Sequence, residues 1–323
     1  MLTTKANTVD VLSKKTHWTT PQYAGMFILF ASVAFVVLLP HWGLTVEDSL
    51  AYFNTARYLR GEVAFSDLRA PFPYRVLIPA LAAYMPGDLR DTFAGINWMS
   101  ITIAAAAMAL VVDRVGGSRK QAVFAGLLLI VSVPTFWYGS YLLTDPGAIC
   151  GRALFVLGVV TGQPWLALGA GLGATAVREE NILLILWLLV NRRVSIFPGL
   201  AVLGAAIGWL LFVRWHLFSG LPRYVWLPSL DTVWTALHDV RAMLSVASAA
   251  VIVVPLAAFG MRHSPVRLTP LKSILVLMAL PPLYAALSVR IDGRAIWSLY
   301  PFLIPFAVYA ISPRASAASS NNC

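Results

Sequence analysis

Residues 93–112 have the sequence FAGINWMSITIAAAAMALVV, which contains no charged side chain. A helix of that length covers the roughly 30 Å hydrocarbon core of a lipid bilayer. Similar apolar runs recur on both sides of it, from Gly25 to Ile311. Only 12% of the 323 residues are charged, whereas a soluble domain has about 25%. This composition excludes a soluble enzyme, a disordered protein and a coiled coil, and it predicts an all-α polytopic membrane protein.

The apolar runs predict about ten transmembrane helices. A spanning helix usually has about 17–25 residues, and the fifth and sixth runs are shorter than that. The predicted spans are Gly25–Leu39, Phe93–Val112, Ala122–Tyr138, Pro146–Thr161, Leu166–Ala176, Ile182–Val190, Ile196–Val213, Met243–Gly260, Ser273–Val289 and Ala295–Ile311. Leu77–Met85 is too short to span, and we predict an outer-surface or re-entrant helix there.

Lysine and arginine are distributed unevenly, and their positions predict the orientation. If the N-terminus is inside, the cytoplasmic side receives twelve basic and two acidic residues, which accounts for the whole net charge of +10. The basic residues are Lys5, Lys14, Lys15, Arg114, Arg119, Lys120, Arg192, Arg193, Arg262, Arg267, Lys272 and Arg314. Nucleic-acid binding is therefore not expected. We predict a multi-pass membrane protein, with cytoplasmic segments at 1–22 and 313–323 and one transmembrane domain at 23–312.

Cysteine and histidine residues do not indicate a disulfide framework or a histidine metal site. Cys150 lies in an apolar run, Cys323 is the last residue, and the five histidines form no cluster. The polar segment at residues 1–22 has no apolar core and no cleavage site, so we expect no removable signal peptide.

The first outer loop, residues 41–91, is much longer than any other loop, which makes it a candidate functional region. Glu47 and Asp48 are adjacent acids near its start, and the apolar spacing over Asp48–Leu59 predicts an amphipathic helix in the membrane interface. A single acid at a helix start is often a cap. A pair of acids at the membrane surface favours a site instead.

Charged residues from other outer loops are predicted to meet this loop on the same face. Arginine inside a span is costly and usually pairs or lines a cavity, and its planar group suits the oxygens of a phosphate. Taken singly, each charge is explained as readily by an interfacial anchor or a structural ion pair. Together they favour a site. Beyond the acidic pair, the candidates are Tyr74, Arg75, Asp145, Arg152, Arg178, Glu179, Arg223, Arg290, Asp292, Arg294 and Tyr300.

These motifs, in their order along the chain, resemble the GT-C superfamily of integral-membrane glycosyltransferases, in particular its small bacterial members that use polyprenyl-phosphate sugars. The resemblance rests on Glu47-Asp48, Tyr74-Arg75-Val-Leu-Ile-Pro79, Leu143-Thr-Asp145-Pro146, Ala176-Val-Arg178-Glu179 and Asp292-Gly-Arg294 followed by Leu299-Tyr300-Pro301.

The resemblance implies that a sugar moves, with inversion, from a polyprenyl-phosphate donor to a hydroxyl of a glycan, lipid or protein acceptor on the outer face. Asp48, or alternatively Glu47, would be the catalytic base. Some members of the superfamily hold a divalent metal at their acids. The residues expected to bind the donor phosphate are Arg75, Arg178, Arg294, Arg290 and Arg223. The expected supporting residues are Tyr74, Asp145, Arg152, Glu179, Asp292 and Tyr300.

Three other functions are compatible with the same residues. A lipid or polysaccharide transporter or flippase would line its pathway with Arg152 and Asp145, but no convincing repeat relates the two halves of the chain. A polysaccharide polymerase or ligase would share the lipid-phosphate substrate. A non-catalytic subunit would stabilise a partner enzyme. The chain has no GxxxxGK loop, so a nucleoside triphosphate is not the expected donor.

Overall fold

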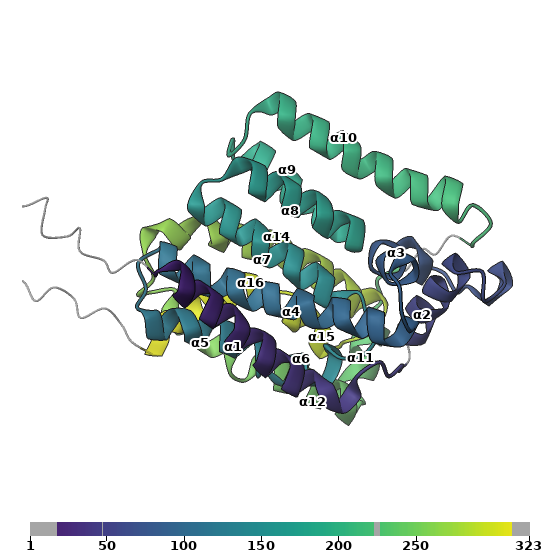
Figure 1. Cartoon of the computed structure of the whole chain (residues 1–323), viewed down its shortest axis with the longest axis horizontal. Coiled ribbons are helices and arrows are strands. Elements are labelled where there is room, and N and C mark those ends of the chain that lie inside the picture. The colour runs from purple at the N-terminus through teal and green to yellow at the C-terminus, as the bar shows by residue number, and fades with distance from the viewer. Residues whose placement is uncertain (1–17, 47, 223–226, 312–323) are drawn as a thin grey trace, which may run out of the picture.

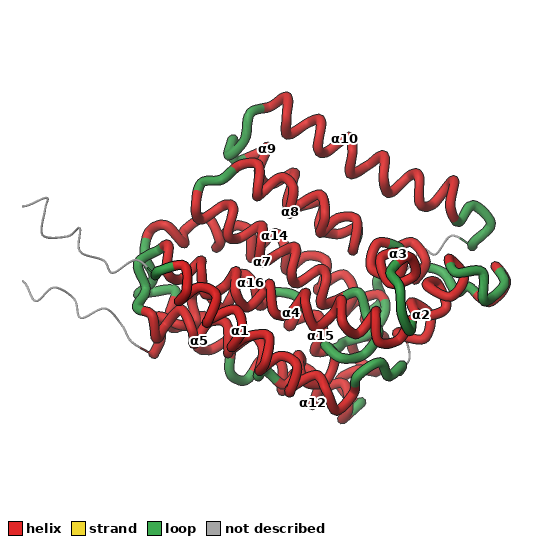
Figure 2. The backbone as a smooth tube through the Cα atoms, viewed as in Figure 1, coloured by secondary structure: helices red, strands yellow, loops and turns green. Residues whose placement is uncertain are grey.

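The computed structural model describes residues 18–46, 48–222 and 227–311, and these residues form helices and no strands (Figure 2). The predicted all-helical class is confirmed for this part of the chain. The α-helices are α1 (Thr20–Leu38), α2 (Asp48–Leu59), α3 (Leu77–Tyr84), α4 (Leu89–Arg114), α5 (Arg119–Ile130), α6 (Val133–Tyr138), α7 (Asp145–Thr161), α8 (Pro164–Val177), α9 (Ile182–Val190), α10 (Ile196–Phe212), α11 (Leu230–His238), α12 (Val240–Ala250), α13 (Val253–Gly260), α14 (Thr269–Ser288), α15 (Gly293–Trp297) and α16 (Tyr300–Ile311). The shorter helical turns are η2 (Leu39–His41), η3 (Phe65–Asp67), η4 (Phe72–Tyr74), η5 (Glu179–Asn181), η6 (Val213–Leu217) and η7 (Val266–Leu268).

The long helices run side by side along the longest axis of the molecule, and α2 and α3 lie at one end (Figure 1). The start of α1 and the end of α16 both lie at the opposite end, at the left in Figure 1. The described chain therefore begins and ends at the same end of the bundle. The predicted cytoplasmic location of segments 1–22 and 313–323 stays a prediction, because most of these residues lie outside the described residues.

Five segments of the described chain are long and apolar enough to cross a membrane. They are Thr20–His41, Leu89–Arg114, Ile196–Leu217, Val240–Gly260 and Val266–Ser288. The structure thus fits a helical membrane protein, but it does not support the count of ten spans.

The other five predicted spans coincide with short or interrupted helices. α7, α8 and α9 have 17, 14 and 9 residues. The predicted span Ala122–Tyr138 is divided between α5 and α6, because Ser132 caps α6 and Pro134 in its first turn lacks the N–H that a continuous helix needs. The last span is similarly divided between α15 and α16.

The described residues of the predicted first outer loop pack onto the start of α4. α2 has the predicted bounds, and α3 ends one residue before the predicted end, at Tyr84. Arg60 donates hydrogen bonds to carbonyl oxygens at the C-terminal end of α3, including those of Ala83 and Met85, both at 3.0 Å. Arg90 lies 4.4 Å from the centre of the Phe53 ring. These contacts hold α2 and α3 in place.

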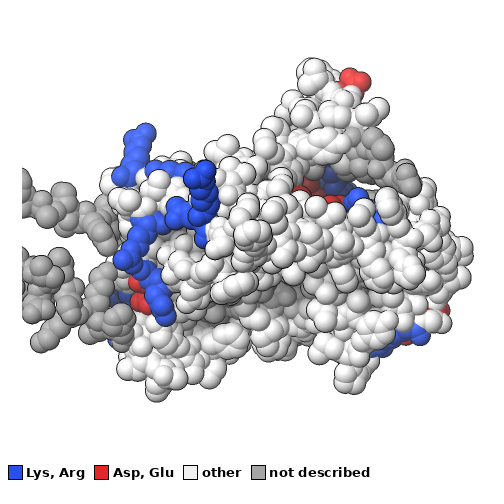
Figure 3. All heavy atoms as spheres, turned by 90° about the horizontal axis from the view of Figure 1, so that it is seen from above, with Lys and Arg blue, Asp and Glu red and all other residues white. Residues whose placement is uncertain are grey.

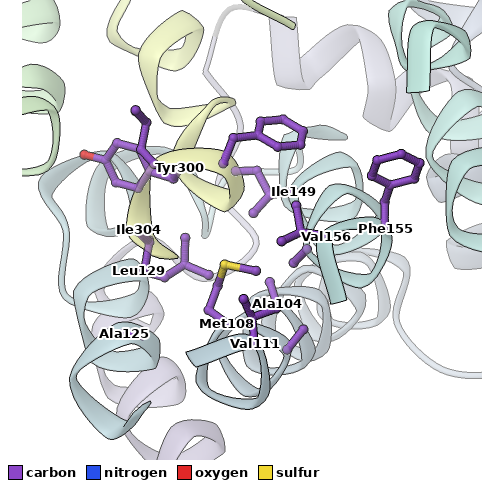
Figure 4. Close-up of a cluster of buried hydrophobic side chains, with 14 of the residues drawn as sticks. Ala104, Met108, Val111, Ala125, Leu129, Ile149, Phe155, Val156, Tyr300 and Ile304 are labelled. Atoms are coloured by element: carbon purple, nitrogen blue, oxygen red, sulfur yellow. The ribbon is translucent and has the colours of Figure 1, made fainter. Parts of the chain in front are cut away.

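The main core lies between α4, α5, α7 and α16. Figure 4 shows Met108 of α4, Leu129 of α5, Val156 of α7 and Ile304 of α16 within one cluster, and all four are fully buried. In lipid, such helices associate chiefly through close van der Waals packing rather than through exclusion of water. The fit of these side chains therefore determines how the four helices are placed.

Two glycines allow α7 and α8 to approach closely. A Cβ atom on Gly151 would lie 2.7 Å from the Cβ of Ala174, and one on Gly158 would lie 2.6 Å from the backbone nitrogen of Ala167. Small residues permit this approach between membrane helices. It brings the end of α8 next to the start of α7, where Asp145 lies.

We expect Gly151→Leu to lower the thermal midpoint of the purified protein in detergent. The added side chain would overlap α8, and overpacking of this kind costs about 1–3 kcal/mol. Gly173→Leu on α8 is the matched control, because no atom lies within 4 Å of a Cβ added there. Equal midpoints for the two variants would contradict the close packing of α7 and α8.

Candidate functional site

Ten charged side chains gather near the end of the bundle that α2 and α3 cover. Five are arginines and five are acids, so their formal charges cancel. We call this group the ionic cluster. Figure 3 shows acidic and basic side chains lying together in a hollow of a largely uncharged surface. The members are Asp48, Arg75, Asp145, Arg152, Arg178, Glu179, Glu180, Arg290, Asp292 and Arg294.

Asp48 stands at the start of α2 and faces two arginines. Its Oδ2 accepts a hydrogen bond of 2.8 Å from Nη2 of Arg294 and lies 3.7 Å from Nη2 of Arg290. Its Oδ1 has no hydrogen-bond partner among the described residues, and the side chain is 29% exposed. Within the described chain, one oxygen of this partly exposed carboxylate therefore has no hydrogen-bond partner.

Asp292 holds both of these arginines from the other side. Its Oδ2 lies 2.9 Å from Nε of Arg294 and 3.0 Å from Nη2 of Arg290. Its Oδ1 accepts from the backbone nitrogen of Arg294, which caps α15, and from the Tyr138 hydroxyl at 3.1 Å. Burial raises the pKa of the Asp292 carboxyl, but the charges of Arg294 and Arg290 and the hydrogen bonds from Arg294 together outweigh burial and hold that pKa below its usual range. Asp292 is thus fully engaged in positioning.

Arg75 and Glu179 form a two-pronged pair. Arg75 Nε lies 3.2 Å from one carboxylate oxygen of Glu179, and its Nη2 lies 3.4 Å from the other. Its Nη1 donates to the Tyr52 hydroxyl of α2 at 2.9 Å. Burial would raise the pKa of the Glu179 carboxyl, but Arg75 outweighs burial and holds it well below its usual range. Both carboxylate oxygens of Glu179 therefore accept hydrogen bonds, whereas only Oδ2 of Asp48 does so among the described residues.

Arg178 joins the two ends of the glycine-packed helix pair. It follows α8 directly, and its Nη1 donates to Asp145 at the start of α7. Its Nε lies 2.7 Å from Oε1 of Glu180. The ion pairs of Arg178 therefore depend on the close approach of α7 and α8.

Arg152 is 1% exposed and uses its guanidinium in three directions. Its Nε donates to Oδ1 of Asn181 at 2.6 Å, its Nη1 donates to the carbonyl of Ser298 at 2.7 Å, and its Nη2 donates to Glu180 at 3.1 Å. All three of its nitrogens are thus bound within the protein and the side chain is buried, so Arg152 has a structural position in this arrangement.

Two predicted supporting residues do not join the ionic cluster. The Tyr74 hydroxyl donates to the carbonyl of Leu221 at 3.5 Å, and the Arg214 guanidinium lies 5.4 Å from its ring centre. The Tyr300 hydroxyl donates to the carbonyl of Ala249 at 2.8 Å. Figure 4 shows the Tyr300 hydroxyl pointing away from the labelled core residues. Both tyrosines contact other helical segments instead of the cluster.

Two other predicted residues, Glu47 and Arg223, lie outside the described residues. Glu47 as an alternative base and Arg223 as a phosphate ligand stay predictions. Among the described residues, no group of three or more His, Cys, Asp or Glu side chains is placed to hold a metal ion. A divalent metal at the acids also stays a prediction.

Several partners in the cluster are absent from the sequence-based candidates. Glu180 is the common partner of Arg152 and Arg178, and its position beside Glu179 is the signal that could have identified it. The Tyr52 hydroxyl accepts a hydrogen bond from Arg75, and the Tyr138 hydroxyl donates one to Asp292. Tyr52 is one of the apolar positions of the predicted amphipathic helix and Tyr138 ends a predicted span, and at both places an aromatic residue is expected for packing alone.

Comparison of the chain with protein-family models, with curated proteins and with solved structures gives no match. Its function is therefore inferred from the ionic cluster and from the position of that cluster in the fold.

The lowered pKa values predict how stability depends on pH. Glu179 and Asp292 have lower pKa values in the folded protein than the usual values of about 4. The unfolded chain consequently binds protons first as pH falls. Their contribution is complete above about pH 5 and is lost progressively below about pH 4. We expect a thermal midpoint in detergent that is nearly constant from pH 8 to pH 5 and then declines.

The Glu179→Gln variant should be less stable at neutral pH and should show a weaker decline in acid. Glu62→Gln is the control, because Glu62 forms an exposed pair with Arg57, and such pairs contribute little. Identical acid profiles for wild type and Glu179→Gln would contradict the assigned role of the Arg75–Glu179 pair.

Proposed function

We propose that this chain is a membrane glycosyltransferase of the GT-C type. It moves a sugar from a polyprenyl-phosphate donor to an acceptor hydroxyl at the outer face of a bacterial inner membrane. The observation that carries the proposal is the pairing of Asp48 with two arginines at the edge of a charge-balanced cluster. One carboxylate oxygen of Asp48 has no hydrogen-bond partner among the described residues.

Arg290 and Arg294 are the best placed arginines for a donor phosphate. Both contact Asp48, and the Arg290 side chain is 42% exposed. Guanidinium groups bind phosphate oxygens through strong charge-assisted hydrogen bonds. An arriving phosphate would replace Asp48 on these arginines, so that both guanidinium groups keep an anionic partner while Asp48 is released.

The other described arginines of the cluster have a different role in this proposal. Arg75 uses all three of its guanidinium nitrogens on Glu179 and Tyr52, and Arg178 pairs with two acids, Asp145 and Glu180. They would maintain the shape of the site by holding α2 and α7 against the α8–α9 connection, residues 178–181. We therefore limit the proposed phosphate contact among the described residues to Arg290 and Arg294.

The proposed reaction is a direct displacement at the anomeric carbon. The acceptor oxygen forms a bond to that carbon while the bond from the carbon to the phosphate oxygen breaks. The electron pair of the broken bond leaves with the polyprenyl phosphate, where the arginines stabilise the charge. Asp48, released from its ion pairs, accepts the proton of the acceptor hydroxyl through its carboxylate. Attack opposite the leaving group inverts the anomeric centre.

The depth of the cluster supports a lipid-borne donor. α8 and α9 have 14 and 9 residues, about 21 and 14 Å, whereas the 26 residues of α4 extend about 39 Å. In Figure 1, α8 stops short of the right-hand end of α4. Residues 178–181 therefore lie below the end of the bundle, at a depth that a lipid phosphate could reach from the side.

Replacing Asp48 by Asn tests the proposed base. The change keeps the shape of the side chain but removes the proton acceptor. With radiolabelled polyprenyl-phosphate sugars, we expect purified Asp48→Asn to release or transfer sugar about 10²–10⁴-fold more slowly than wild type, with donor binding retained. Asp231→Asn, an exposed change outside the cluster, is the control and should leave turnover unchanged.

The outcomes of this test separate the alternatives. Near-normal turnover in Asp48→Asn with loss only in Glu47→Gln would move the base by one residue. If both variants turned over normally, or if wild type neither released nor transferred sugar from any such donor, the glycosyltransferase proposal would fail.

The proposed orientation can be tested separately with single cysteines in a background that carries Cys150→Ala and Cys323→Ala. Exposed positions 120 and 262 should react with a membrane-impermeant maleimide only in inverted vesicles, and positions 67 and 231 only in intact spheroplasts. The physical reason is the excess of Lys and Arg at one end of the bundle. Labelling of position 120 from outside would reverse the orientation and remove the site from the outer face.

A further inference from the structure

A pocket of about 920 Å³ lies at the opposite end of the bundle from the ionic cluster. It opens between the end of α4, the end of α7, the α9–α10 connection and the start of α14. Its lining includes the four basic residues Arg114, Arg193, Arg267 and Lys272 and no acidic residue. Figure 3 shows Lys and Arg side chains gathered at this end, at the left of the view. The two ends of the molecule therefore differ in electrostatic character.

The four basic side chains converge from separate parts of the chain. Arg267 of η7 donates to the carbonyl of Arg114 at 3.2 Å, which links η7 to the end of α4. Arg193 lies between α9 and α10, and Lys272 lies in the first turn of α14. Within the described chain, none of the four forms an ion pair. Their charges are thus available to an anion.

The pocket also has an apolar wall. Val159 and Val160 of α7, Trp187 of α9 and Val266 of η7 belong to its lining. The indole nitrogen of Trp187 donates to Ser273 Oγ at 3.1 Å, which fixes the ring between α9 and α14. A free inorganic anion gains nothing from such a wall, whereas an amphiphile would place its apolar part there.

We infer that this pocket binds the anionic phosphate headgroup of a membrane lipid. Its volume lies within the range of small-molecule sites, about 300–1,000 Å³. Guanidinium groups match phosphate oxygens, and basic pockets between membrane helices on the cytoplasmic side favour anionic headgroups. The inference does not rest on the proposed glycosyltransferase function, because it uses none of the residues of the ionic cluster.

The excess of basic residues at this end also has a general explanation, since such residues set membrane orientation. That explanation requires only charge near the helix ends. It does not require four cations from separate segments to line one concave surface beside an apolar wall. The experiment must therefore compare pocket residues with other basic residues at the same end.

Native mass spectrometry of the full chain, purified in a non-ionic detergent, tests the inference. The probes are phosphatidylglycerol, cardiolipin and phosphatidylcholine, with inorganic phosphate as a competitor. We expect bound phosphatidylglycerol or cardiolipin and no retained phosphatidylcholine. Displacement of the anionic lipid by millimolar inorganic phosphate would assign the pocket to a free anion and overturn the lipid inference.

Two double variants give the decisive comparison. Arg193→Gln with Lys272→Gln removes two pocket charges and should weaken binding of the anionic lipid at least about tenfold. Lys120→Gln with Arg262→Gln removes the same charge from exposed residues at the same end but outside the pocket lining, and it should change affinity less than about threefold. Equal losses in the two variants, or unchanged binding in the first, would overturn the inference. Lys272→Gln alone serves if the first double variant does not fold.

Discussion

A buried guanidinium is costly unless its charge is paired and hydrogen-bonded, and Arg152 of α7 finds its partners by drawing separate segments together. Asn181 and Glu180 come from the α8–α9 connection, and the Ser298 carbonyl comes from the junction of α15 and α16. Glu180 is shared with Arg178, which returns the network to α7 through Asp145. The position of the outer part of the bundle therefore depends on this one side chain.

The sequence predicts those features of the fold that depend on local pattern. α2 and α9 have the predicted bounds, and α4 contains the uncharged run from which the membrane prediction begins. The number of spans does not follow from local pattern in the same way, because it depends on where each helix ends. Ser132 and Pro134 divide one predicted span. Serine and proline are also tolerated within continuous membrane helices, so the apolar pattern alone does not reveal the break.

The sequence also predicts which charges gather at one end but not how they pair. Asp48, Arg290 and Arg294 meet as predicted, since their loops lie at the same end of the bundle. Pairing depends on helix rotation, which a motif does not encode. Tyr300 adjoins a candidate motif, but its position on α16 directs it toward Ala249. Tyr138 lies in an apolar run, but it faces Asp292.

The two charged ends would treat an incoming anion differently. In the ionic cluster every arginine already has a carboxylate partner, so an anion must exchange places with an acid. This requirement suits a site in which binding of one substrate frees a base for another. The basic pocket has no acid in its lining, so an anion can enter it without displacing a carboxylate. Exchange of an anion with an acid suits a site that turns over substrate. Binding of an anion without such an exchange suits a pocket that holds a lipid for a long time.

The shortness of α8 and α9 has a consequence for the surrounding membrane. Their lengths of about 21 and 14 Å are less than the roughly 30 Å of hydrocarbon that they would have to cross. In the proposed membrane placement, the bilayer beside them would thin locally or water would fill the hollow above residues 178–181. The hydration of the ion pairs would then depend on bilayer thickness, and lipids with longer acyl chains would make the same cluster drier and its partners harder to exchange.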